Sequence, residues 1–147
     1  MGKFLILLIF LFFGAYGEDS KQEITKSKAE VIKREVYHNY QEALSAAKAE
    51  NKNIFILFQA KGCRWCKKLK ETTLKDPELL KRLNRSFVML ILDRESSSYP
   101  KKYKIEGVPT IYMISNKEEI YVRRVGYRQD PQEYIKWFNY IEIESDS

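Results

Sequence analysis

The sequence contains very few side chains of the kinds that bind transition metals. Cys63 and Cys66 are the only cysteines, and His38 is the only histidine, among 147 residues. A structural zinc site needs about four such ligands, so this composition argues against zinc. Covalent haem attachment requires a histidine directly after the second cysteine, and Lys67 stands there. We therefore expect no metal and no other cofactor, although two thiolates leave copper(I) binding open as an alternative.

The sequence also lacks an apolar run long enough to cross a membrane. Residues 4–13 are apolar without interruption, but a membrane-spanning helix needs roughly 20 residues. Lys3 precedes this run, and Gly14-Ala15-Tyr16-Gly17, which has small residues at three of four positions, follows it before the first acidic residues. A basic start, an apolar middle and small residues at the end are typical of a secretory signal peptide. We expect residues 1–17 to be cleaved and the protein to be periplasmic or secreted, with an uncleaved membrane tether as the alternative.

No long block of one charge is present. Lys and Arg number 26 against 20 Asp and Glu, a formal net charge of +6, and basic and acidic side chains are interleaved along the chain. This pattern favours a mixed, solvated surface, so we expect no nucleic-acid partner. Residues 18–35 are polar and have few large apolar groups, which predicts a polar N-terminal linker. Residues 36–143 then provide enough chain for one domain with a core but not for two.

Apolar patterning within this domain predicts an α/β fold. Four apolar runs that are too short for helices predict strands at residues 53–60, 87–92, 109–114 and 120–125. Helical periodicity and helix-start signals predict helices at residues 36–50, 63–71, 77–83 and from 131 onward, with one helical turn at 101–104. Strands separated by helices pair in parallel, and the last two strands form a hairpin. The prediction is a central mixed sheet of four to five strands flanked by helices.

The two cysteines fall at the turn from the first predicted strand into the next helix. Unpaired backbone N–H groups and the helix dipole at that point lower the pKa of Cys63, which favours its role as the attacking nucleophile. Cys66 lies one turn further into the helix and is better shielded, so it is the predicted resolving thiol. A disulfide between residues this close in sequence stabilises a fold little, which favours a redox role. Arg64 and Lys67 are candidates for tuning the thiolate, although Lys67 is equally well explained as a solvated lysine.

Three sequence blocks resemble the thioredoxin superfamily. They are Cys63-Arg64-Trp65-Cys66, then Gly107-Val108-Pro109-Thr110 before a predicted strand, then Gly126-Tyr127 before the last helix. Their order and spacing cover residues 36–142. The chain is most similar to exported bacterial thioredoxin-like proteins with a basic segment after the second cysteine. The resemblance implies a thioredoxin fold and thiol–disulfide oxidoreductase activity.

The resemblance also implies roles for residues outside the cysteine pair. Pro109 corresponds to the cis-proline of this fold, beside the cysteines, and the backbone of Val108 would pair with an extended substrate. Trp65 offers an apolar surface to a substrate, or alternatively packs on a neighbouring loop. One departure is Leu57, which stands where thioredoxins carry a buried acid six residues before the first cysteine. We therefore predict slow resolution by Cys66, with water or Glu71 as the proton acceptor.

The predicted function is that of an exported thiol–disulfide oxidoreductase, with reduction of protein disulfides as the favoured direction. The expected partners are protein thiols or disulfides and a membrane electron donor or acceptor. The alternative is a non-enzymatic thiol module that binds copper(I) or a partner protein. We interpret His38 as a surface residue. The tyrosines at positions 112, 121 and 127 are interpreted as strand packing.

Overall fold

The computed structural model describes residues 35–95 and 97–145. These residues belong to one compact unit, Lys33–Ser147. The predicted signal peptide, and the predicted linker up to residue 34, lie outside the described residues. Within the described part of the chain, no helix is both long and apolar enough to cross a membrane.

The described residues form a five-stranded mixed sheet with strand order β1-β3-β2-β4-β5. The strands are β1 (Val36–Tyr37), β2 (Asn53–Gln59), β3 (Phe87–Asp93), β4 (Thr110–Ile114) and β5 (Ile120–Val125). β3 pairs in parallel with both β1 and β2, whereas β4 runs antiparallel to its neighbours β2 and β5. The predicted mixed α/β sheet is confirmed.

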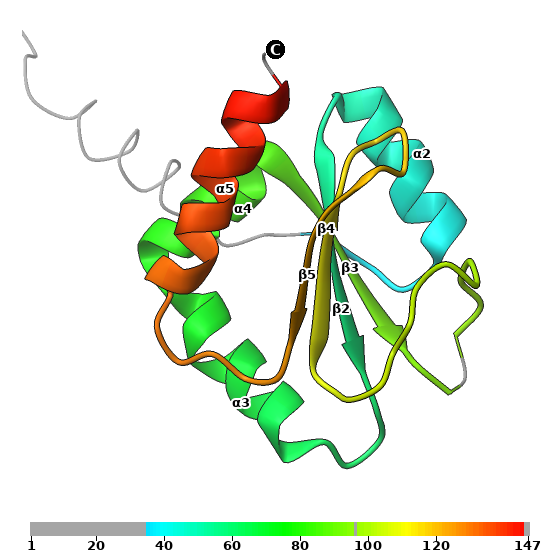
Figure 1. Ribbon diagram of the computed structural model, residues 1–147, viewed down its shortest axis with the longest axis vertical. Coiled ribbons are helices and arrows are strands. Elements are labelled where there is room, and N and C mark those ends of the chain that lie inside the picture. Colours follow the sequence, from blue (N-terminus) through cyan, green and yellow to red (C-terminus); the bar gives the residue numbers. More distant parts are fainter. Residues whose placement is uncertain (1–34, 96, 146–147) are drawn as a thin grey trace, which may run out of the picture. The chain divides into compact units, whose positions relative to one another are not determined.

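In the described part of the chain, four α-helices and one 3-10 helix flank the sheet. They are α2 (Tyr40–Glu50), α3 (Arg64–Glu71), η1 (Thr73–Lys75), α4 (Pro77–Ser86) and α5 (Gln132–Ser145). Figure 1 shows α3, α4 and α5 on one side of the sheet and α2 on the other. The loop from β2 and the start of α3 lie together at the lower end of that view, so the cysteine pair is at one end of the sheet.

The prediction of a helix beginning at residue 36 is wrong. Residues 36 and 37 form β1, which pairs with Met89 and Leu90 of β3. The helix begins at Tyr40 because Asn39 caps it: the Asn39 side-chain oxygen accepts backbone N–H bonds at 2.9 and 3.2 Å. Residues 101 and 102 form a turn, and residues 103 and 104 have no regular secondary structure, in place of the predicted helical turn.

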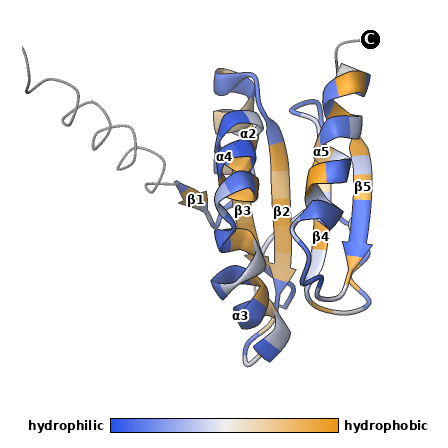
Figure 2. Cartoon of the chain, turned by 90° about the vertical axis from the view of Figure 1, so that its left-hand side faces the viewer, coloured by the Kyte–Doolittle hydropathy of each residue, from blue (hydrophilic) through white to orange (hydrophobic). Residues whose placement is uncertain are grey.

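Alternate side chains of the strands supply two separate cores. Phe55 and Leu57 of β2 belong to the core beneath α3, α4 and α5, together with Phe138 of α5. Ile54, Ile56 and Phe58 belong to the core beneath α2. All five of these β2 side chains have a relative exposure of 0%, so β2 is buried on both faces. β2 and β3 are coloured hydrophobic along most of their length in Figure 2, as this double burial requires.

Candidate redox site

A short turn after β2 places Cys63 at the start of α3. Gly62 has a φ of +75°, a conformation that glycine adopts without strain. Cys63 is the N-cap residue of α3, and the backbone N–H of Cys66 donates a hydrogen bond to Cys63 Sγ over 3.1 Å. The two sulfur atoms form a disulfide, with the Cα atoms 5.3 Å apart. On reduction, a Cys63 thiolate would face unpaired N–H groups and the positive end of the helix dipole.

The two cysteines differ in their access to solvent. Cys66 has a relative exposure of only 2%, whereas Cys63 is half-buried. A sulfur atom of a second molecule can therefore reach Cys63 more readily than Cys66. Thiol–disulfide exchange depends on which sulfur is open to attack. The structure thus has the asymmetry that separate attacking and resolving thiols require.

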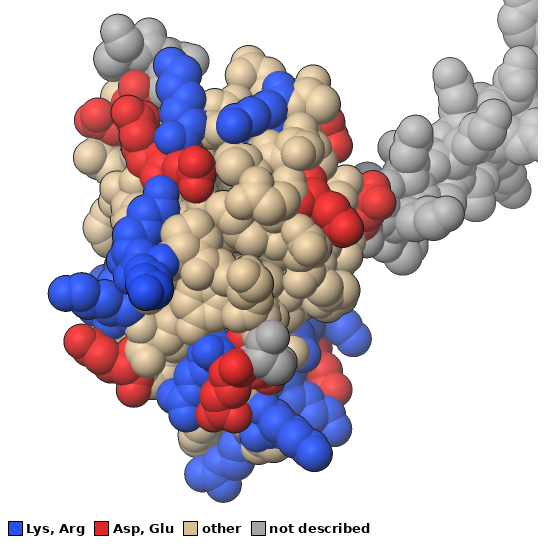
Figure 3. Space-filling view, turned by 90° about the vertical axis from the view of Figure 1, so that its right-hand side faces the viewer, with Lys and Arg blue, Asp and Glu red and all other residues tan. Residues whose placement is uncertain are grey.

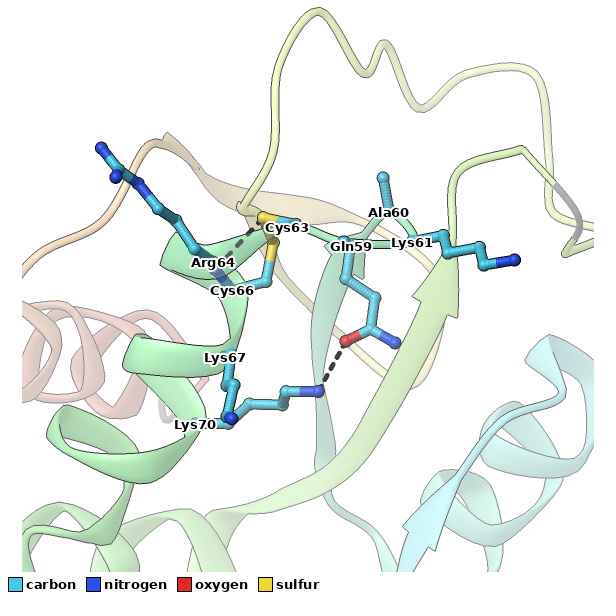
Figure 4. Close-up of a pocket in the computed structure, with 9 residues that line it drawn as sticks. Gln59, Ala60, Lys61, Cys63, Arg64, Cys66, Lys67 and Lys70 are labelled. Atoms are coloured by element: carbon cyan, nitrogen blue, oxygen red, sulfur yellow. Dashed lines mark hydrogen bonds between the residues drawn. A yellow bond between two sulfur atoms is a disulfide. The ribbon is translucent and has the colours of Figure 1, made fainter.

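A depression of about 460 Å³ lies beside the disulfide (Figure 4). Of the predicted site residues it brings together the two cysteines, Arg64 and Lys67; Trp65, Val108 and Pro109 are not in its lining. The full lining is Gln59, Ala60, Lys61, Gly62, Cys63, Arg64, Cys66, Lys67 and Lys70. All of its ionisable groups other than the cysteines are therefore basic.

Gln59 and Lys70 line the depression, and the sequence analysis did not predict that they contact each other. Lys70 Nζ donates a hydrogen bond to Gln59 Oε1 over 2.8 Å, and this bond joins the end of β2 to the second turn of α3. Figure 4 shows both side chains on one side of the disulfide, while Arg64 extends away from it. The basic segment after Cys66 was the signal that could have indicated Lys70. Nothing in the local sequence connects it to Gln59.

Lys67 and Glu71 face solvent rather than the sulfur atoms. The Lys67 side chain is 73% exposed, and its Nζ lies 3.9 Å from a Glu71 carboxylate oxygen. Glu71 is also absent from the lining of the depression. Leu57, at the position of the acid expected from the resemblance, is fully buried in the apolar core. Glu71 therefore shows no contact that would make it a substitute for that acid.

Trp65 stacks on Tyr127 on the other flank of α3. The ring centroids are 5.4 Å apart, and the ring planes are inclined by 22°. Lys68 Nζ lies 5.4 Å from each ring centroid, and the Arg64 guanidinium lies 5.0 Å from that of Trp65. Trp65 nevertheless stays 42% exposed. The contact with the loop before α5 thus leaves much of the indole available to another molecule.

Tyr127 is held by a second contact as well as by the stack. Its hydroxyl lies 3.3 Å from Thr72 Oγ1 at the end of α3. This hydrogen bond lowers the pKa of the Tyr127 hydroxyl. Tyr127 packs against the core beneath α3, α4 and α5 as well as on Trp65, although it follows β5 rather than lying in a strand. Tyr112, in contrast, is buried in the core beneath α2, as expected.

The Val108–Pro109 peptide bond is cis, the isomer that the resemblance implies. Pro109 is buried, and its carbonyl oxygen accepts a hydrogen bond from the Gly126 N–H over 2.8 Å. Thr110 Oγ1 donates a hydrogen bond to the Gly107 carbonyl over 2.6 Å. The loop before β4 is therefore tied both to itself and to the residue that follows β5.

His38 lies at the surface, with its Nδ1 3.2 Å from the carbonyl oxygen of Ile91. The cysteine pair is therefore the candidate functional feature, and His38 is a surface residue. In residues 35–95 and 97–145, no group of three or more His, Cys, Asp or Glu side chains is placed to hold a metal ion.

Comparison with known proteins gives a consistent result. The family model described as Thioredoxin-like domain matches residues 40–142. Protein disulfide-isomerase A3 of Gallus gallus is 30% identical over 105 residues, which is 70% of this chain and 18% of that protein. Spermatogenesis-associated protein 20 of Mus musculus is 38% identical over 55 residues, which is 37% of this chain and 7% of that protein.

A similar solved structure is a thioredoxin from Thermus thermophilus, with a TM-score of 0.63 and 22% identity. The match covers 76% of this chain and 88% of the thioredoxin. The chain spans less than a fifth of the length of the curated relatives it matches. Together, the fold and the bonded Cys-x-x-Cys pair support thiol–disulfide oxidoreductase chemistry.

Proposed function

The chain belongs to the thioredoxin-like domain family, and we propose that it is an exported thiol–disulfide oxidoreductase that reduces disulfides in other proteins. The observation that carries this proposal is the unequal placement of the two thiols. Cys63 is half-buried at the N-cap of α3, and Cys66 is 2% exposed behind it. A dithiol in this arrangement presents one reactive sulfur and keeps the second within bonding distance.

The reaction proceeds through two exchanges. The Cys63 thiolate attacks one sulfur of the substrate disulfide, forms a mixed disulfide and releases the first substrate thiolate. The Cys66 thiol gives its proton to water and attacks Cys63 Sγ, which releases the second substrate thiolate and forms the Cys63–Cys66 disulfide. Two electrons pass from the protein to the substrate. A dithiol donor must then return two electrons, and outside the cytosol we assign this role to a membrane protein.

Residues around the pair support substrate binding in this proposal. The exposed part of Trp65 contacts the apolar surface of the substrate near its cysteine. The backbone of Val108, which precedes cis-Pro109, pairs with an extended substrate segment. Arg64 and Lys67 stabilise the Cys63 thiolate through their charges, from positions where solvent screens them strongly.

The direction of electron flow is the part of the proposal that most needs a measurement. A basic site favours the thiolate form and therefore oxidising power, whereas the family resemblance favours reduction. The reduction potential of the Cys63/Cys66 pair separates these cases, by equilibration of the protein in thiol redox buffers and counting of free thiols. A value near about −270 mV supports a reductase, and one near about −120 mV identifies an oxidant that installs disulfides.

A trapping experiment tests the assignment of the two thiols. Cys66→Ser cannot complete the second exchange, so we expect it to accumulate as a mixed disulfide with an oxidised model protein. Cys63→Ser is the matched control and should trap none. Equal trapping by both variants would contradict the assignment. If the wild-type protein bound copper(I) tightly and exchanged no disulfides, the result would support the alternative function, a non-enzymatic thiol module that binds copper(I).

A further inference from the structure

The chain around the disulfide is more basic than the rest of the domain. Residues 61–70 contain five positive side chains and no negative one. These residues, called the basic collar here, are Lys61, Arg64, Lys67, Lys68 and Lys70. Figure 3 shows the opposite side of the domain, the side of α2, where acidic side chains lie among the Lys and Arg side chains at the lower end.

Helix stability accounts for only part of the basic collar, because Lys68 and Lys70 lie in the last turn of α3, where cations stabilise the helix. Among the described residues, the other three α-helices each carry an acid in the first turn: Glu42 in α2, Glu78 in α4 and Glu133 in α5. The first turn of α3 has none. Because the N-terminal end of a helix dipole is positive, acids stabilise that end and cations destabilise it. The charge of Arg64 at the start of α3 therefore opposes local stability and requires another explanation.

The collar is not neutralised within the domain. In the described part of the chain, the one ion pair made by any collar residue is Lys67–Glu71, at 3.9 Å with both side chains more than half exposed. Such a pair contributes little, and salt screens it. Arg64 and Lys68 lie instead over the Trp65 ring, at 5.0 and 5.4 Å. Several exposed cations thus surround the disulfide without acidic partners.

The cations lie on both sides of the reactive sulfur. Lys67 and Lys70 line the depression on one side of Cys63. Lys68 lies over the Trp65–Tyr127 stack on the other flank of α3. A substrate segment bound across Cys63 therefore meets positive charge on either side of its own cysteine.

We propose that the substrates of this protein carry Asp or Glu residues next to the reacting cysteine, an inference that rests on the proposed function. The collar attracts an acidic segment before contact, and complementary charge of this kind raises association rates by about tenfold to a thousandfold at low salt. Trp65 supplies the apolar contact between the charged flanks. The exchange chemistry itself is unchanged.

The test uses three peptides of one length, each with a single cysteine capped by mercaptoethanol through a mixed disulfide. The cysteine is flanked by Glu, Gln or Lys residues in the three peptides. The pre-reduced protein is mixed with each peptide, and the released peptide thiol is quantified over time. We expect the Glu peptide to react at least about tenfold faster than the Lys peptide at low salt. The ratio should approach one at about 1 M salt, where the Debye length is roughly 3 Å.

Two charge-reversed proteins separate recognition from reactivity. Lys61→Glu/Lys68→Glu changes the collar, whereas Lys81→Glu/Lys136→Glu makes the same charge change at exposed positions of α4 and α5. We expect the ratio of Glu-peptide to Lys-peptide rates to fall about tenfold in the first protein and to stay unchanged in the second. The Gln peptide corrects for any change in the nucleophilicity of Cys63.

The outcomes distinguish this inference from the proposed function. Equal rates for the Glu and Lys peptides in the wild-type protein, or the same ratio in both variants, would overturn the inference alone. Failure to reduce any of the three peptides would overturn the proposed function and the inference with it. Stronger inhibition by a single-stranded oligonucleotide or by phosphatidylserine vesicles than by polyglutamate would assign the collar to a different kind of partner.

Discussion

The two faces of the central sheet are packed by different means. Beneath α3, α4 and α5, aromatic rings pack on one another, with Phe138 centred 4.7 Å from Phe87 and 6.4 Å from Phe55. Beneath α2, the tyrosines also hydrogen-bond: the Tyr40 hydroxyl lies 2.9 Å from that of Tyr103. We call these the apolar face and the hydroxyl face. Helix α3 lies on the apolar face, where Leu69 packs in the core, and the hydrogen bond from Lys70 to Gln59 also ties it to β2.

Buried hydroxyl groups show the same contrast. On the hydroxyl face, Tyr40 also donates a hydrogen bond to Glu118 over 2.7 Å. On the apolar face, the buried Tyr134 hydroxyl has no hydrogen-bond partner among the described residues, and burial raises its pKa to about 12. A buried hydroxyl with partners stabilises a fold, whereas one without partners costs free energy. A buried tyrosine hydroxyl therefore stabilises the fold on the hydroxyl face and destabilises it on the apolar face.

The largest effect on stability is expected from a cavity in the core of the apolar face. Phe138→Ala removes a ring with 0% exposure from the centre of this core, so we expect the free energy of unfolding to fall by about 3–5 kcal/mol. Denaturant unfolding measures the change. Ile143→Ala is the control on the same helix, because Ile143 is 68% exposed and its loss should change stability by less than about 0.5 kcal/mol. Equal losses in the two variants would contradict this description of the core.

A matched pair of tyrosine variants tests the contrast between the faces. Tyr40→Phe deprives Tyr103 and Glu118 of a partner, and we expect a loss of about 1–3 kcal/mol. Tyr134→Phe removes a hydroxyl without a partner, so stability should be unchanged or slightly higher. Denaturant unfolding of both variants under one set of conditions gives the comparison. A larger loss for Tyr134→Phe would reverse the assignment of the two faces.

An acid placed in the apolar face tests how Cys66 loses its proton. Leu57→Asp restores the acid that the resemblance leads one to expect, and we predict about tenfold faster resolution of the mixed disulfide, or about 1.4 kcal/mol in activation free energy. Leu57→Asn is the control, since it loses the same apolar packing without gaining a proton acceptor. Stopped-flow kinetics across pH measure the step. An exchange rate that Leu57→Asp leaves unchanged at every pH would refute the prediction.

The smallest effect is expected in the pH dependence of stability. The hydrogen bond from Tyr40 lowers the pKa of Glu118 from its ordinary value of 4.5. A lowered folded-state pKa contributes stability above the unfolded value, and this contribution is lost as the pH falls through the folded value. Tyr40→Phe should therefore lose less stability than the wild-type protein when the pH falls below 4.5. The free energy of unfolding is measured against pH for both proteins. Parallel curves would show that the protonation of Glu118 is not linked to folding through Tyr40.

The fold was largely predictable because its strands are short apolar runs and its helices have local start signals. Asp76 and Pro77 illustrate this, since Asp76 caps α4 with two hydrogen bonds to backbone N–H groups. β1 was not predictable, because Val36 and Tyr37 become a strand only by pairing with distant β3. Local sequence also favoured a helix there, and tertiary pairing overrode it.

The candidate site was predictable where its residues are adjacent in sequence. The Cys63 cap and the burial of Cys66 follow from their spacing at a strand-to-helix turn. The Trp65–Tyr127 stack and the Gln59–Lys70 hydrogen bond were not predictable. Both join separate elements, and their geometry depends on how α3 lies against the rest of the domain.

The two edge strands of the sheet, β1 and β5, affect whether the protein aggregates at high concentration. An unpaired edge strand can add strands from another copy, and such edges are protected when they are short or charged. β1 has only two residues, which leaves little edge for such pairing. β5 carries Arg123 and Arg124, which form ion pairs with Glu106 and Glu133. A second copy of the domain would have to displace these charges to extend the sheet, so the architecture disfavours aggregation through its edges.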